Sequence, residues 1–146
     1  MCTQINMTYF RQENEYFCGP AIVKMLVPEA GQDALAYLLK TNPVTGTSHL
    51  EIKEMLEIFG FCCKENFGVE PLLSSNGTGT ANLICYIEPE EQEGHFAFMK
   101  EMDSDTVTLI DPYYGENHRI SRSYFMNNWR GESTPPLLVI TNFSKK

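Results

Sequence analysis

The sequence lacks the features that mark several large classes of protein. No stretch approaches the ~20 consecutive apolar residues of a transmembrane helix, so we expect no membrane span. Residues 1–7 carry neither a basic patch nor an apolar run, which argues against a Sec signal peptide. No Cys-x-x-Cys pair occurs, which argues against a zinc site or a thioredoxin-like redox function. These absences predict a cytoplasmic protein with no cofactor and no metal, and they leave export by a specialised secretion system open.

Clustered positive charge is also missing. The chain has 11 Lys and Arg residues, which are scattered, against 19 Asp and Glu residues, and its formal net charge is −8. Binding of nucleic-acid phosphates needs clustered Lys and Arg, so we expect no nucleic-acid partner. Neither an internal repeat nor a linker divides the 146 residues. This length predicts a single domain over residues 1–146, and such a domain buries roughly 68–70% of its unfolded surface. The sequence leaves its oligomeric state open.

The most informative segment runs from Gln12 to Ala21 and places a cysteine at the start of a helix. Five cysteines in a chain without a signal peptide predict reduced thiols. Cys18 opens a stretch that reads as a helix over residues 18–27, in which Pro20 is tolerated in the first turn. A helix N-terminus favours the thiolate, the nucleophilic form of cysteine, and an amide donor at Gln12 is placed to bind an oxyanion. For a cysteine considered alone, the better interpretation is a small buried hydrophobe.

A nucleophilic cysteine needs a base, and the base needs an orienting group. His95 begins an apolar segment with strand composition, directly after the acidic loop 88–93. A second alternating segment, residues 106–110, ends at Asp111 because Pro112 cannot continue the hydrogen-bond ladder. The short polar link 102–105 makes the two strands a hairpin. Folding this hairpin brings Asp111 beside His95.

The other two histidines are weaker candidates for the base. His49 follows Ser48, which forms a capping box with Glu51, so we expect a solvated residue in the first turn of a helix. His118 falls in the polar segment 115–119, which reads as a loop at the rim of the cleft. Strand placement and the hairpin geometry therefore favour His95 over His118.

The periodicity of the chain predicts helices first and strands second. Helices are expected over residues 18–27, 33–40, 50–59 and 123–129, and strands over residues 61–67, 82–87, 95–101, 106–110 and 137–143. The predicted fold class is α+β, with an N-terminal helical half packed on a C-terminal antiparallel β-sheet and a cleft between the two halves.

The order of these motifs resembles a known family. The motifs are, in order, Gln12, Cys18-Gly19-Pro20, Gly94-His95-Phe96, Asp111-Pro112-Tyr113-Tyr114-Gly115 and Trp129-Arg130-Gly131. In this order they resemble papain-like cysteine peptidases, specifically those related to bacterial peptidases that cleave double-glycine leader peptides. The resemblance spans residues 12–129. It implies the papain-like fold, with Cys18 as nucleophile, His95 as general base and acid, Asp111 as the orienting group and Gln12 as oxyanion donor.

The resemblance defines the chemistry more closely than the substrate. Leader-cleaving members usually carry an acidic residue directly before the cysteine, whereas this chain has Phe17, and its Cys-Gly-Pro step looks more like the stand-alone relatives. We therefore expect a cysteine hydrolase that cleaves a peptide or amide bond in a peptide or protein substrate through an acyl-enzyme. A deamidase or an acyltransferase with the same triad, as in the related phytochelatin synthase, is the alternative. An exported effector acting on host proteins and a non-catalytic peptide-binding module of this fold also stay open.

Overall fold

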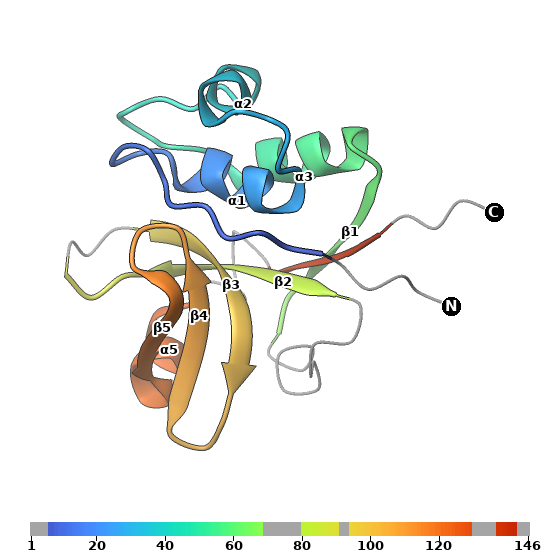
Figure 1. The fold of residues 1–146 in the computed structure, drawn as a ribbon. Coiled ribbons are helices and arrows are strands. Elements are labelled where there is room, and N and C mark those ends of the chain that lie inside the picture. The colour runs from blue at the N-terminus through green and yellow to red at the C-terminus, as the bar shows by residue number, and fades with distance from the viewer. Residues whose placement is uncertain (1–5, 69–79, 91–93, 130–136, 143–146) are drawn as a thin grey trace.

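The computed structural model describes residues 6–68, 80–90, 94–129 and 137–142. Three helices come first, and a sheet follows with one further helix before its last strand (Figure 1). The helices are α1 (Cys18–Leu26), α2 (Gln32–Leu38), α3 (His49–Ile58) and α5 (Arg122–Asn128). The strands are β1 (Phe61–Asn66), β2 (Ala81–Ile87), β3 (Gly94–Met102), β4 (Thr106–Asp111), β5 (Gly115–Ser121) and β6 (Leu137–Asn142).

Every predicted helix and strand is present, with each end shifted by no more than two residues. The strands form one six-stranded sheet in the order β1-β6-β2-β3-β4-β5, and each neighbouring pair is antiparallel. The α+β prediction is therefore confirmed.

The prediction of a loop over residues 115–119 is wrong, because these residues belong to the edge strand β5. The segment is polar, so it lacks the apolar alternation that marks a half-buried strand. It is a strand because it pairs with β4 after a tight turn, in which Gly115 adopts a φ of +122°. Such a φ favours glycine, because it lies in a region that side chains rarely adopt.

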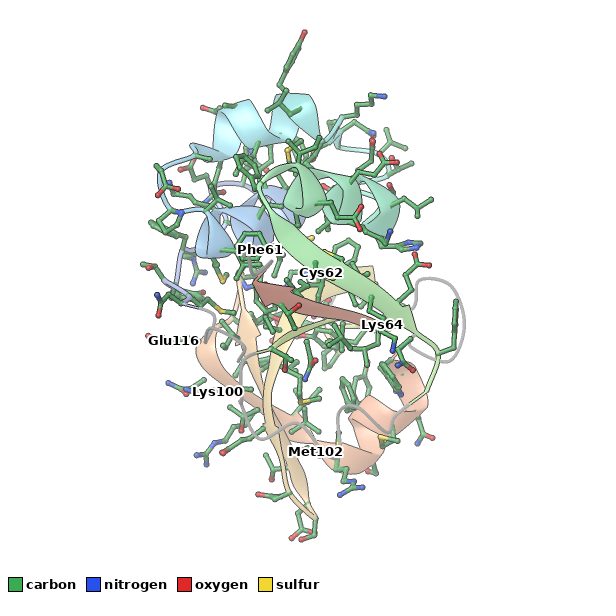
Figure 2. The ribbon with its side chains drawn as sticks, turned by 90° about the vertical axis from the view of Figure 1, so that its right-hand side faces the viewer. Phe61, Cys62, Lys64, Lys100, Met102 and Glu116 are labelled. Carbon is green, nitrogen blue, oxygen red and sulfur yellow. The ribbon has the colours of Figure 1, made fainter. Side chains whose placement is uncertain are left out.

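Two apolar cores lie on opposite faces of the sheet, and the helices divide between them (Figures 1 and 2). The first core joins α1, α2 and α3 to side chains such as Leu83 and Phe98. The second joins α5 to the opposite face, where the rings of Phe125 and Trp129 stack with centroids 5.6 Å apart. Successive residues of β2, such as Leu83 and Ile84, therefore point into different cores, as the two-residue period of a strand requires.

The pairing of β3 with β4 is irregular, on the side of the sheet that ends at the polar edge strand β5. The pairing of β3 with β4 shifts between Met99 and Glu101, which makes Lys100 the extra residue of a bulge. Figure 2 shows the Lys100 side chain pointing outward on the side of Glu116. Its ammonium group donates a hydrogen bond to Asn117 of β5.

The helix that carries Cys18 is held by a close contact at the next residue. Gly19 is buried in the first turn of α1, and a Cβ atom built on it would collide with the side chain of Thr47. The Thr47 hydroxyl is itself hydrogen-bonded to the Thr41 hydroxyl at 2.7 Å, so Thr47 is not free to swing away. The start of α1 is therefore in direct contact with the segment between α2 and α3.

This contact predicts that Gly19→Ala destabilises the protein. Alanine is the better helix former, but overpacking of this kind costs about 1–3 kcal/mol. Gly31→Ala is the matched control, because a Cβ on Gly31 meets no atom within 4 Å, and it should change the free energy of unfolding by less than about 0.5 kcal/mol. Urea unfolding of both variants measures the difference. Equal stability of the two variants would contradict the close approach of Gly19 to Thr47.

Candidate active site

Cys18 lies at one edge of an open cleft between the helical half and the sheet. It is the first residue of α1, as predicted, and its side chain is partly exposed to the cleft. The cleft has a volume of about 680 Å³, within the range of about 300–1,000 Å³ that is usual for ligand sites. Residues from both halves of the molecule line it, among them Gln12, Cys18, Glu88, His95, Tyr113 and Tyr114.

The structure places His95 and Asp111 side by side, as the hairpin argument predicts. Phe98 of β3 pairs with Ile110 of β4, so His95 and Asp111 are diagonal neighbours on one face of the sheet. The His95 Nε2 atom lies 2.7 Å from Asp111 Oδ1. A carboxylate only accepts hydrogen bonds, so Nε2 carries the proton and donates it in this bond.

Asp111 is the centre of a buried hydrogen-bond network. Its side chain is fully buried, with no exposed surface. Beside the bond from His95, it accepts bonds from the Tyr86 hydroxyl at 2.7 Å and from the backbone N–H groups of Tyr113 and Tyr114 at 2.8 and 3.0 Å. Burial alone raises the pKa of Asp111, but the hydrogen bonds from His95, Tyr86 and the Tyr113 N–H outweigh it and lower the pKa. Asp111 therefore stays ionised although it is buried.

His95 is held between this carboxylate and the Cys18 thiol. Burial lowers the pKa of His95, but hydrogen bonds to Asp111 and to Cys18, together with their negative charges, outweigh burial and raise the pKa to about 10. Because Nε2 faces Asp111, the nitrogen left for Cys18 is Nδ1. This arrangement favours an imidazolium beside the sulfur.

Gln12 reaches the same cleft from the chain before α1. Its side chain is buried and lines the cleft with Cys18 and His95. The Nε2 group donates a hydrogen bond to the Asn14 carbonyl at 2.8 Å, which leaves a second N–H on the same nitrogen. The Oε1 atom is buried and has no hydrogen-bond partner among the described residues.

Tyr86 and Tyr114 complete the site, and of these two Tyr86 was not anticipated from the sequence. Tyr86 pairs with His95 across β2 and β3, and the edge of one ring meets the face of the other at 5.9 Å. Tyr114 contacts His95 in the same way and donates a hydrogen bond to the buried Glu88 at 2.5 Å. The one sequence signal for Tyr86 was a tyrosine inside a strand of mostly apolar residues, because a buried Tyr hydroxyl usually has a partner.

The surroundings of the other two histidines differ from those predicted. His118 lies on β5 behind Tyr114, whose ring stacks on it at 4.6 Å, and it is not among the residues that line the cleft. His49 is in the first turn of α3, as predicted, and Ser48 accepts the capping bond from the Glu51 N–H. However, the expected solvation of His49 is wrong, because its side chain is only 14% exposed and its Nε2 lies 3.7 Å from Glu65.

Neither a cluster of metal-ligating side chains nor a membrane-spanning helix is found among the described residues. Within residues 6–68, 80–90, 94–129 and 137–142, no group of three or more His, Cys, Asp or Glu side chains is arranged to hold a metal ion. In the same part of the chain, each helix is too short or too polar to cross a membrane.

Comparisons with known proteins identify the family to which this fold belongs. Residues 6–136 match the model of the peptidase C39 family. No curated protein matches the chain. Three solved structures with low sequence identity share the papain-like fold of this family.

The peptidase domain of Streptococcus ComA, a bifunctional ABC transporter in a quorum-sensing pathway, is 20% identical, with a TM-score of 0.72 over 92% of this chain and 99% of that one. A double-glycine motif protease from an AMS/PCAT transporter, solved with the leader peptide, is 15% identical, with a TM-score of 0.70 over 95% of this chain and 94% of that one. A C39-like protein from Bacillus anthracis is 12% identical, with a TM-score of 0.73 over 99% of this chain and 98% of that one.

The family match covers most of the chain and includes the segments that carry Gln12, Cys18, His95 and Asp111. It confirms the resemblance drawn from the order of the motifs. The chain therefore belongs to the peptidase C39 family and is a thiol-dependent cysteine peptidase.

Proposed function

We propose that the protein hydrolyses a peptide bond through a thioester formed on Cys18. The Cys18 thiolate attacks the substrate carbonyl carbon, and the C–N bond breaks as His95 gives its Nδ1 proton to the leaving amine. A water molecule then loses a proton to the same nitrogen and attacks the thioester. This step releases the carboxylic acid and returns Cys18 and His95 to their starting forms.

One observation carries this proposal: His95 Nε2 is hydrogen-bonded to the buried Asp111 carboxylate at 2.7 Å, which leaves Nδ1 for the Cys18 thiol that lines the same cleft. Asp111 fixes the ring orientation and stabilises the imidazolium without accepting its proton. The raised pKa of His95 supports an imidazolium that is present at neutral pH, before substrate binds. Proton transfer to the leaving group then needs no earlier protonation step.

The oxyanion of the tetrahedral intermediate needs hydrogen-bond donors close to the sulfur. The Cys18 backbone N–H is one candidate, since the first N–H groups of a helix have no partner within the helix. The second is the remaining N–H of Gln12 Nε2, which belongs to a side chain lining the same cleft. Together these two groups form the oxyanion hole of the proposed reaction.

The proposed substrate is an extended peptide segment that enters the cleft. The cleft opens to solvent between the helical half and the turn that carries Tyr113 and Tyr114, which suits a chain segment better than an enclosed small molecule. One structural relative was solved with a double-glycine leader peptide. A peptide with a double-glycine motif is therefore the first substrate to test.

Cys18→Ala should abolish cleavage of such a peptide while leaving the fold and the affinity for the peptide nearly unchanged, because the sulfur acts in bond making. Cleavage is followed by mass spectrometry, affinity by calorimetry, and folding by circular dichroism. If a folded Cys18→Ala protein retains the biological effect of the native protein unchanged, the domain acts by binding and the proposal is wrong.

His95→Ala should lower kcat/KM by a factor on the order of 10⁴ or more, and Asp111→Asn by a smaller factor. Asp111→Asn should also move the alkaline limb of the pH–kcat/KM profile to lower pH. The reason is that the negative charge of Asp111 raises the pKa of His95, and its removal lets the ring lose its proton earlier. The profiles of wild type and Asp111→Asn on one peptide measure this shift.

His118→Ala is the matched control, since it removes the other imidazole near Tyr114. It should cost roughly tenfold or less, which is about 1.4 kcal/mol in barrier terms. A folded His118→Ala enzyme that is inactive, beside an active His95→Ala enzyme, would reverse the assignment of the base.

A further inference from the structure

A buried side-chain amide on α2 forms hydrogen bonds to the backbone of the two residues that flank Gln12. The side chain of Gln32, the first residue of α2, is 3% exposed. Its Nε2 group donates a hydrogen bond to the Arg11 carbonyl at 2.7 Å, and its Oε1 atom accepts one from the Glu13 N–H at 2.9 Å. Gln32 thus uses both ends of its amide on the two residues that flank Gln12.

The opposite side of the same backbone is bound to the turn between β4 and β5. The Gln12 N–H donates to the Pro112 carbonyl at 2.9 Å, directly after Asp111. In an extended chain, the C=O of one residue and the N–H two residues later point to one side, while the N–H between them points to the other. Gln32 and Pro112 therefore hold residues 11–13 from opposite sides through hydrogen bonds to their backbone.

These hydrogen bonds hold the backbone around Gln12, whose neighbours in the chain are exposed. Arg11 and the residues at 13–15 are exposed, and Gln12 is the buried residue within this run. An exposed segment has few buried apolar contacts, so hydrogen bonds contribute much of its positioning, together with the stacking of the Arg11 guanidinium on the Tyr113 ring at 5.4 Å. With the backbone fixed on both sides, the Gln12 side chain is directed into the cleft beside Cys18 and His95.

We infer that Gln32 is a positioning residue for catalysis, which holds Gln12 where its amide meets the developing oxyanion. This inference rests on the proposed function of Gln12 as oxyanion donor. Helix α2 contributes no residue to the lining of the cleft. Through Gln32 it nevertheless positions a residue that takes part in the proposed reaction.

A double-mutant cycle tests this inference, using Gln12→Ala, Gln32→Met and the double variant on one peptide. Methionine has a similar shape and makes neither hydrogen bond. Gln12→Ala should lower kcat by about 10²–10³, the usual loss of one oxyanion donor. Gln32→Met should lower kcat by roughly ten- to a hundredfold with KM nearly unchanged, since small displacements of a catalytic group have effects of this size. In the Gln12→Ala background, Gln32→Met should lower kcat no further, because the group that it positions is already absent.

Asn128→Leu is the matched control, since it removes another side-chain amide that donates to a backbone carbonyl, that of Tyr124 at 2.8 Å, on α5 away from the cleft. It should lower the melting temperature without lowering kcat. Gln32→Glu is a second variant, which keeps the acceptor for the Glu13 N–H and loses the donor to the Arg11 carbonyl. It should show a smaller loss of kcat and the same lack of additivity, and it keeps the test decisive if Gln32→Met does not fold.

The possible failures are distinguishable. If Gln12→Ala leaves kcat unchanged, the oxyanion assignment fails and the inference fails with it. A second outcome is that Gln12→Ala lowers kcat while both Gln32 variants leave kcat unchanged. A third is that the Gln32 variants lower kcat by the same factor with and without Gln12→Ala. Either of these outcomes would show that Gln32 does not act through Gln12, and only this inference would be overturned.

Discussion

The site depends on one buried carboxylate. Asp111 has no exposed surface and is bound by four donors, which come from β2, from β3 and from the turn between β4 and β5. Burying a charge costs several kcal/mol unless hydrogen bonds compensate it, so these donors are a condition for the fold as well as for the chemistry. They fix the turn that binds the Gln12 backbone through Pro112. One group thus sets the positions of His95 and, through the turn, of Gln12.

Much of the fold could be predicted because its elements carry strong local signals. The apolar stripe after Cys18, the Ser48 cap of α3 and the positive φ of Gly60 after it all act within a few residues. The alternation of residues 106–110 and the stop at Pro112 likewise define β4. β5 could not be predicted, because its pairing with β4 makes it a strand and its own polar sequence does not.

The predicted site residues come together because local geometry links them. His95 and Asp111 share one hairpin, and Cys18 begins the helix that packs beside it. The residues that form hydrogen bonds around the predicted site residues were not predicted, because their partners are distant in sequence. Tyr86 meets Asp111 across 25 residues, and Gln32 meets the segment around Gln12 across about 20. The buried face of His49 against Glu65 was missed for the same reason. Long-range hydrogen bonds of this kind leave no periodic pattern in a sequence.

The most direct test of the Cys18–His95–Asp111 arrangement is the order in which the five cysteines react with iodoacetamide at about pH 6, below the usual thiol pKa of about 8.5. Sites are mapped by mass spectrometry after limited labelling. In the wild type, Cys18 should be labelled first, because the His95 imidazolium favours its thiolate, and in His95→Ala this advantage should disappear. Labelling of Cys2, Cys62, Cys63 or Cys85 before Cys18, or an unchanged advantage in His95→Ala, would contradict the account.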